Sequence, residues 1–311
     1  MRLAFIIDPI SRLDPGHDTS VAIMEAAEQL GHEVWITEVH QLAVIEGSAW
    51  ATLQPVKFTG IDSPWYTLGD QELLSLEMMD AVFMRKDPPV NIYYLYATYI
   101  LDLIDPAKTL VVNSPQGLRE ANEKMYTLRF ASVMPATVVS QNKAIIRKFV
   151  ESHGSAVLKP LGGKGGEGIL FLETGDRNFN SLIEVSTQQG KEPVMIQAFL
   201  SEAKDGDKRI IVLDGKPIGA VNRVPSGSEF RGNMAVGGRV EKTEITPREL
   251  AICGQLAPQL QGNGLYFVGI DVIGGYLTEI NVTSPTGVRE IDRLQGTRLG
   301  KQVITWLEEK K

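Results

Sequence analysis

The chain has 311 residues, of which 43% are hydrophobic and 22% charged, so it can bury one large core or two to three smaller ones and is not expected to be disordered. Its formal net charge of −7 excludes a general positive field that would hold nucleic acid. The single cysteine, Cys253, excludes an intramolecular disulfide, and four histidines without paired spacing argue against a zinc site, so a reducing cytoplasm is the expected location.

The first third of the chain is predicted to alternate strands and helices. Strands are expected at residues 3–7, 33–38, 81–84 and 110–112, and a one-sided helix at residues 18–30. This order indicates a βαβ start on a parallel sheet. The turn after the first strand lacks the glycine fingerprint of dinucleotide-binding folds, so NAD is not expected there. The most apolar helix, residues 92–104, is interrupted by Asp102 and is shorter than the roughly 20 residues that a membrane span needs, so we expect a soluble protein.

Shorter and better separated elements follow residue 122. Strands are predicted at residues 137–139, 156–159 and 168–172 with a helix at 142–152, and then a hairpin at residues 209–223. Thr246 and Glu249 form the sequence pattern of a capping box at the start of a helix, which places Cys253 on a packed face rather than in a nucleophilic role. We therefore expect three units, at residues 1–122, 123–196 and 197–311.

The segment 269–281 is predicted to be a hairpin that carries oxygen ligands. Glu279 and Asn281 are two residues apart, so an extended strand projects them from one face together with Leu277. A two-residue turn would place Asp271 on the face opposite Glu279, whereas a three-residue loop through Tyr276 would pair the two carboxylates directly, and we predict the three-residue loop. Carboxylate and carboxamide oxygens without His or Cys favour Mg²⁺ or Mn²⁺. Taken alone, the hairpin could equally be a solvated sheet edge.

A loop with five glycines, residues 158–168, is predicted to join two strands. Such a loop leaves its backbone amides open to an anion and can act as a lid. It is not a P-loop, because no Lys-Ser or Lys-Thr follows the glycines and no helix is expected to begin there. Lys159 and Lys124 are the cations that we expect beside phosphate oxygens, although either one taken singly reads as a surface charge.

Arginines in predicted loops form the last group of candidates. Their guanidinium forks suit carboxylates, so several together indicate a substrate that carries more than one carboxylate. A solvated surface position is least expected for Arg85, which ends an apolar strand before two prolines. The other members are Arg209, Arg223, Arg231, Arg239 and Arg289.

Six motifs in order resemble bacterial glutathione synthetase, a family of the ATP-grasp ligases, over nearly the whole chain. They are Met84-Arg85-Lys86-Asp87-Pro88-Pro89, Asn122-Glu123-Lys124, Leu158-Lys159-Pro160-Leu161, Asp205-Gly206-Asp207-Lys208-Arg209, Phe230-Arg231-Gly232-Asn233 with Gly237-Gly238-Arg239, and residues 277–286. The departures are a lid at residues 162–168 that is richer in glycine and charge, and Gly287 in place of a bulkier residue. These departures bear on substrate discrimination and not on the chemistry.

The resemblance implies an α/β fold with α+β subdomains, namely an ATP-grasp fold with an N-terminal Rossmann-like parallel-sheet domain. It also implies the ATP-dependent joining of γ-L-glutamyl-L-cysteine to glycine, through an acyl phosphate, to give glutathione, ADP and phosphate. A cytoplasmic homotetramer that acts on small molecules is implied, without nucleic acid or membrane partners, and the apolar helix at residues 92–104 is a candidate contact surface.

The resemblance also implies roles for individual residues. Arg209 and Arg223 are expected to stabilise charge at the acyl centre, and loops 162–168 and 224–239 to close over the site. A Mg²⁺ or Mn²⁺ ion is expected on Asp271, Glu279 and Asn281. The expected ATP-binding residues are Lys124, Lys159, Gly162, Gly163, Gly165, Gly166, Gln197, Leu200 and Asp207. The expected substrate-binding residues are Arg85, Arg231, Asn233, Arg239, Ser284, Thr286 and Arg289.

Two other functions remain open at this point. A ligase of the same fold could add glutamate or another amino acid to a different acceptor, although such an enzyme has little need of the arginine set. A nucleotide-binding scaffold could keep the fold without catalysis, but it would gain nothing from a lid that excludes water.

Overall fold

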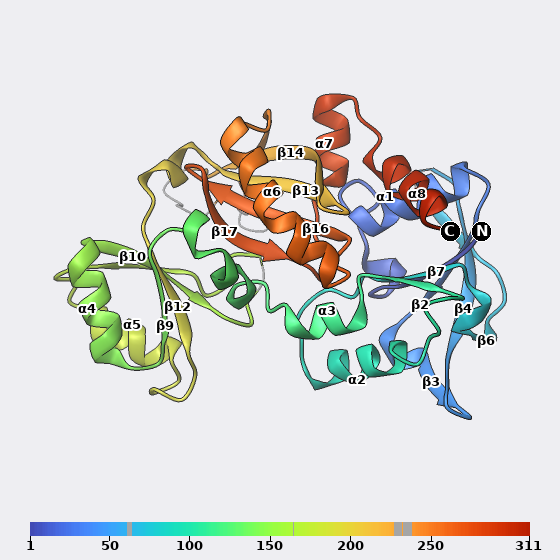
Figure 1. The fold of residues 1–311 in the computed structure, drawn as a ribbon, viewed down its shortest axis with the longest axis horizontal. Coiled ribbons are helices and arrows are strands. Elements are labelled where there is room, and N and C mark those ends of the chain that lie inside the picture. The colour runs from blue at the N-terminus through green and yellow to red at the C-terminus, as the bar shows by residue number, and fades with distance from the viewer. Residues whose placement is uncertain (61–63, 164, 227–231, 233–237) are drawn as a thin grey trace.

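The computed structural model describes residues 1–60, 64–163, 165–226, 232 and 238–311. In this part of the chain the strands form three sheets, which lie side by side along the long axis of the molecule (Figure 1). The sheet formed last along the chain lies between the other two, and the last helix of the chain packs against the first helix.

The first sheet has a parallel centre, as the sequence predicts. Strand β1 pairs in parallel with β2 and β7, and β7 pairs in parallel with β8. Four of the five residues of β1 are buried, because helices cover both faces of a parallel sheet. The meander β3 to β6 adds antiparallel strands through β4 and was not predicted. The elements are β1 (Arg2–Ile6), η1 (Ile10–Arg12), α1 (Thr19–Gln29), β2 (Glu33–Thr37), η2 (Val39–Gln41), β3 (Leu42–Ile45), β4 (Ser48–Phe58), β5 (Tyr66–Leu68), β6 (Glu72–Ser75), η3 (Leu76–Met78), β7 (Ala81–Met84), α2 (Ile92–Leu101), β8 (Leu110–Val112) and α3 (Pro115–Glu120).

The second sheet is small and antiparallel, with the strand order β11-β10-β12-β9. Two helices pack on it through buried residues such as Ile146 and Phe179, and the glycine loop connects β10 to β11. This confirms the sheet, helix and loop predicted after residue 122. The elements are η4 (Met125–Val133), β9 (Thr137–Ser140), α4 (Lys143–His153), β10 (Ser155–Pro160), β11 (Leu170–Glu173), α5 (Phe179–Ser186) and β12 (Val194–Ala198).

The third sheet is antiparallel, with the order β15-β14-β13-β16-β17, and α6 covers one face. Both halves of the predicted capping box are present, because Thr246 accepts a bond from the Glu249 amide and the Glu249 carboxylate accepts one from the Thr246 amide. Cys253 is buried in α6, and burial raises the pKa of its thiol to about 12, so it is a packed thiol as predicted. The elements are η5 (Ser201–Asp205), β13 (Asp207–Leu213), β14 (Lys216–Val224), β15 (Arg239–Lys242), α6 (Pro247–Gly262), β16 (Phe267–Ile273), β17 (Tyr276–Asn281), α7 (Val288–Gln295) and α8 (Leu299–Lys310).

Helices α7 and α8 connect the end of the chain to its beginning. Buried residues of β1 and α1 share one hydrophobic cluster with Val288, Leu299 and Leu307. A Cβ atom on Gly300 would lie 2.6 Å from the Ala22 carbonyl oxygen, so glycine permits the close approach of α8 to α1. The two ends of the chain consequently lie together at one end of the molecule (Figure 1).

The apolar helix α2 ends at Leu101, three residues before the predicted end. Asn91 caps its start by accepting bonds from the Tyr93 and Tyr94 amides. Among the described residues, no helix has both the length and the apolar character that a membrane span requires.

Candidate active site

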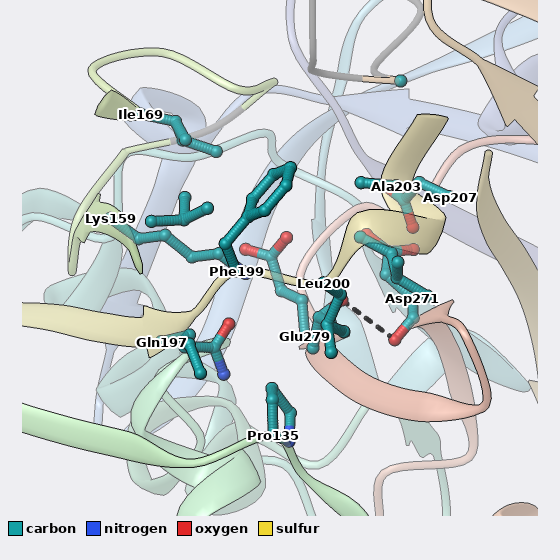
Figure 2. Close-up of a pocket in the computed structure, with 15 residues that line it drawn as sticks. Pro135, Lys159, Ile169, Gln197, Phe199, Leu200, Ala203, Asp207, Asp271 and Glu279 are labelled. Carbon is teal, nitrogen blue, oxygen red and sulfur yellow. Dashed lines mark hydrogen bonds between the residues drawn. The ribbon is translucent and has the colours of Figure 1, made fainter. Parts of the chain in front are cut away.

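A pocket that is partly open to solvent lies where the second and third sheets meet. Its walls come from the strands β10, β12, β13, β16 and β17 and from η5, so segments distant in sequence converge there. Figure 2 shows Lys159, Asp271 and Glu279 around the same space. The lining residues are Pro135, Val157, Lys159, Ile169, Gln197, Ala198, Phe199, Leu200, Ala203, Asp207, Gly232, Asp271, Ile273, Thr278 and Glu279.

The hairpin of β16 and β17, residues 267–281, is called the acidic hairpin below. It pairs Asp271 with Glu279, as predicted, but through a turn of a different length. The predicted three-residue loop is wrong, because Gly274 and Gly275, with φ of 56° and 76°, form a two-residue turn that pairs Ile273 with Tyr276. A register shift between Asp271 and Val272 leaves Thr278 as the extra residue of a β-bulge.

The bulge also changes which side chains share a face. Leu277 was expected beside Glu279, but it pairs with Val272 and is buried in the core. Beyond Thr278 the alternation restarts, so Ile280 enters the core while Glu279 and Asn281 share the face of Asp271. The carboxylates therefore face the pocket without taking core positions.

Asp271 is the centre of a buried ion-pair network. Arg209 donates to both of its carboxylate oxygens, from Nε at 2.5 Å and from a terminal nitrogen at 3.0 Å. Arg223 adds a second guanidinium at 3.0 Å. Burial by itself would raise the pKa of the Asp271 carboxyl, but the two arginines hold that pKa well below its usual range. Asp271 is therefore a carboxylate at neutral pH.

Asp207 begins β13 and faces the same pocket. One of its oxygens accepts a bond of 2.6 Å from Arg223, whereas the other, Oδ1, is buried and has no hydrogen-bond partner among the described residues. Burial and the nearby Asp271 carboxylate raise the pKa of Asp207 to about 6 and outweigh Arg223. An unpartnered buried acceptor in a pocket suits a ligand hydroxyl.

Lys124 connects the acidic hairpin to the glycine loop. Its buried Nζ lies 3.0 Å from a Glu279 oxygen and donates to the Gly163 carbonyl at 2.8 Å. Lys159 lines the pocket from β10, and burial lowers the pKa of its ammonium although Glu279 opposes the shift. Each lysine therefore presents positive charge close to the Glu279 carboxylate.

The oxygens of the hairpin side chains are of the kind that a hard divalent cation prefers, and Asp271 holds both of its oxygens toward Arg209. Glu279 is a half-buried carboxylate on the pocket wall. The Asn281 amide nitrogen donates to Gly269 at 3.2 Å and to Asp271 at 3.3 Å, which turns its carbonyl oxygen away from that carboxylate. Within the described residues, no group of three or more His, Cys, Asp or Glu side chains forms a metal cluster, so this oxygen set would need ligand oxygens to complete its shell.

Of the other predicted ATP-binding residues, two line the pocket, whereas the four glycines of the loop are not among its lining residues. Gln197 and Leu200 line the pocket, and the Gln197 amide donates to the Thr137 hydroxyl at 3.2 Å. In the glycine loop, Gly165 and Gly166 have φ of 61° and 83°, values that side chains disfavour. Gly162 neighbours Leu161, whose carbonyl accepts a bond from Asn122.

The predicted substrate residues are not all gathered at this pocket. Thr286 is linked to it, because its carbonyl accepts a bond from Arg209 at 3.0 Å. Arg85 is buried and donates to Ser20 and to the Pro285 carbonyl, next to Ser284. Arg239 and Arg289 form ion pairs with Glu241 and Glu25 on other parts of the molecule. Arg231 and Asn233 lie outside the described residues.

Three apolar residues of the pocket wall, Ile169, Pro135 and Val157, were not predicted from the sequence. Phe199 lies within the expected ATP-binding strand 197–200, and Figure 2 shows it between Lys159 and Glu279 in this view. In sequence such residues are indistinguishable from core positions of short strands. Glu123 was also missed as a site residue, although it lies between two residues of a recognised motif.

The pocket combines apolar walls with a charged end. Aromatic and aliphatic walls suit a heterocycle, and the Asp207 oxygen suits a sugar hydroxyl. Lysines and arginines at the other end suit phosphates and a reacting carboxylate. Charged side chains held in place by ion pairs at the pocket suit phosphoryl transfer by positioning.

Comparison with known proteins agrees with this geometry. The family model "Prokaryotic glutathione synthetase, N-terminal domain" matches residues 1–119, and "Prokaryotic glutathione synthetase, ATP-grasp domain" matches residues 123–296. The chain is 68% identical over 317 aligned residues to the glutathione synthetase of Synechocystis sp., with 99% of each chain covered. It is 64% identical to that of Nostoc sp., with 99% of this chain and 98% of the relative covered.

Solved structures share the fold at low sequence identity. An ATP-grasp ligase, PsnB, in complex with Mg and ADP matches with a TM-score of 0.68 at 19% identity, covering 99% of this chain and 97% of PsnB. D-cycloserine synthetase DcsG matches with a TM-score of 0.67 at 14% identity over the whole of both chains. The predicted α/β ATP-grasp fold is confirmed, and the chain belongs to the prokaryotic glutathione synthetase family.

Proposed function

We propose that this chain joins γ-L-glutamyl-L-cysteine to glycine at the expense of ATP, giving glutathione, ADP and phosphate. Family membership supports an ATP-dependent ligase. The observation that carries the proposal is the contact of Lys124 with both Glu279 and the Gly163 carbonyl, because it brings a cation, an acidic ligand and the glycine loop to one point.

The chemistry requires two displacements. An oxygen of the cysteinyl carboxylate attacks the γ-phosphorus, and the bond to ADP breaks. The glycine amine then attacks the acyl carbon of the resulting acyl phosphate, phosphate leaves, and the amine loses a proton. Since neither step needs an enzyme nucleophile, the protein acts by holding charge and excluding water.

Several residues around the pocket have a part in this scheme. Lys124 and Lys159 neutralise phosphate oxygens. The free Asp207 oxygen accepts a ribose hydroxyl. The segment from Gln197 to Leu200, which includes Phe199, lies against the adenine. Arg209 and Arg223 lie at the charged end, where negative charge develops on the acyl group.

A Mg²⁺ or Mn²⁺ ion is part of the proposal. Asp271, Glu279 and Asn281 would hold it, and a bound divalent ion would neutralise the phosphates and polarise the transferred group. We also propose that the protein works in the cytoplasm and that the chain divides into units at residues 1–122, 123–196 and 197–311.

We further propose a homotetramer, with α2 as a contact surface. The ten residues of α2 include no charged side chain, and Tyr93, Tyr96 and Tyr99 are exposed, a composition that is typical of interface cores. Light scattering on the purified protein tests this, since four copies of a 34.2 kDa chain are expected and a monomer mass would overturn the proposal.

The function itself is tested by ADP release with Mg²⁺-ATP and γ-glutamylcysteine, with and without glycine, and with alanine, serine and glutamate as alternative amines. We expect glycine-dependent turnover and glutathione as product. Turnover with another amine in preference to glycine would indicate a different ligase, and ATP binding without any turnover would indicate a scaffold.

A further inference from the structure

Glu123 lies between the glycine loop, the strand β17 and the segment that follows β17. Its neighbours in sequence, Asn122 and Lys124, both contact the glycine loop, Asn122 through the Leu161 carbonyl at 3.1 Å. The backbone carbonyl of Glu123 accepts a bond from the Ile280 amide at 3.0 Å, on the outer edge of β17. The residue is therefore fixed to the acidic hairpin before its side chain is considered.

The Glu123 side chain holds the segment that follows β17. One carboxylate oxygen, Oε1, accepts bonds from the Val282 amide at 3.1 Å, the Thr283 amide at 3.3 Å and the Thr283 hydroxyl at 2.9 Å. Val282 and Thr283 are buried. Amides of consecutive residues that share one acceptor oxygen define the direction in which the chain leaves the strand.

That direction sets the loop that carries the predicted dipeptide-binding residues. Ser284 and Thr286 follow directly, and the Pro285 and Thr286 carbonyls are held by Arg85 and Arg209 at 3.0 Å each. Arg85 and Arg209 hold the far part of the loop, whereas Glu123 holds its start. Without Glu123, the two amides would lose their acceptor at a site where replacement by water is restricted.

The Glu123 carboxyl is subject to opposing electrostatic effects. Burial raises the pKa of the Glu123 carboxyl, and the Glu279 carboxylate raises it further, while the bonds from Thr283 and the charge of Lys124 lower it. A carboxylate next to another carboxylate is unfavourable unless its own donors compensate. The donors on Val282 and Thr283 supply that compensation.

We propose that Glu123 is a positioning residue for the acyl-donor substrate, because its carboxylate orients the segment 282–286 beside the acidic hairpin. This rests on the proposed function, in which that segment binds the dipeptide. Glu123 is not one of the residues that line the nucleotide pocket, so we expect its replacement to affect dipeptide binding more than ATP binding.

The test distinguishes an effect on the KM for the dipeptide from an effect on the KM for ATP. We expect Glu123→Ala to raise the KM for γ-glutamylcysteine about tenfold or more, the loss expected when charge-assisted bonds are removed, and to change the KM for ATP less than about twofold. Glu123→Gln keeps a carbonyl acceptor and should recover most of the loss. Glu120→Gln, an exposed glutamate three residues earlier, is the control and should match the parent protein.

Hydrogen exchange gives a readout that does not depend on turnover. The Val282 and Thr283 amides should exchange faster in Glu123→Ala than in the parent protein, while amides of β16 stay protected. If Glu123→Ala does not fold, Thr283→Val removes only the hydroxyl bond, and about a threefold rise in the dipeptide KM is expected. The double variant Glu123→Ala with Thr283→Val should have a dipeptide KM only slightly above that of Glu123→Ala.

A parallel rise in both KM values, or unchanged exchange at Val282 and Thr283, would overturn the proposal. Failure of the proposed function looks different, because the parent protein itself would then not consume γ-glutamylcysteine. In that case hydrogen exchange still decides whether Glu123 orients the segment.

Discussion

Glu279 pairs with Lys124 and lines the pocket, and its side chain is 20% exposed against 2% for Asp271, so it is the more accessible carboxylate of the acidic hairpin. Replacing Glu279 by Gln keeps the side-chain shape but removes the charge that would bind a divalent ion. We expect Glu279→Gln to lower the Mg²⁺-dependent ADP release by about a hundredfold or more, within the range known for loss of one stabilising group in an active site.

The fold should survive this change, since Glu279 is not in the core. A thermal unfolding midpoint within a few degrees of the parent protein is the expected control result, and Glu241→Gln on the surface of β15 should keep full activity. An undiminished rate in Glu279→Gln would remove Glu279 from the proposed metal site.

Asp207 leads to a prediction about pH. Because burial raises its pKa to about 6, the carboxyl is protonated below that pH, and its free oxygen then no longer accepts a charge-assisted hydrogen bond from a ribose hydroxyl. The affinity for adenosine should therefore be full above about pH 6 and fall roughly fivefold to tenfold on acidification, the difference between charged and neutral acceptors.

Adenosine is the suitable probe because it has no phosphate that titrates in this range. Calorimetric titrations from pH 5 to pH 8 measure the effect. Asp207→Asn should bind adenosine with an affinity that no longer changes across pH 6, and a persisting pH dependence in this variant would assign the titration to another group.

At the scale of elements, the start of α6 was predictable because capping is local. Thr246→Ala removes the acceptor for the Glu249 amide and should lower the free energy of unfolding by about 1 kcal/mol, whereas Thr246→Ser keeps the oxygen and should be nearly neutral. Denaturant unfolding of the two variants checks this. Equal stabilities would mean that another group, or water, caps the helix.

The acidic hairpin shows why an element can be predicted correctly and still be misread in detail. Its two strands follow from the apolar pattern, and the two glycines are typical of a tight turn. The bulge at Thr278 is not encoded by any local pattern. It forms because Leu277 and Ile280 must both enter the core while Glu279 faces the pocket, and regular alternation cannot satisfy all three.

At the scale of the whole molecule, α8 joins the end of the chain to its first sheet. Gly300→Ala would place a Cβ atom 2.6 Å from the Ala22 carbonyl oxygen and 3.2 Å from the Ala26 Cβ, so the helices must move apart. We expect it to lower the free energy of unfolding by about 1–3 kcal/mol.

Gly254 in α6 provides the matched control for Gly300. No atom lies within 4 Å of a Cβ built on Gly254, so Gly254→Ala should be neutral or stabilise by up to about 1 kcal/mol through helix propensity. Urea unfolding of both variants measures the difference. A Gly300→Ala protein as stable as the parent would show that α8 does not pack tightly on α1.

The sequence by itself determined the parallel first sheet, the small antiparallel sheet with its glycine loop, the capped helix and the family, because period, capping and motif order are local or linear properties. Only the tertiary structure decided which charges meet. Arg209 and Arg223 share Asp271, Lys124 reaches Glu279, and Glu123 holds Val282, and each of these contacts joins residues more than 45 positions apart. Such contacts depend on how three sheets pack against one another, which no local pattern of side chains specifies.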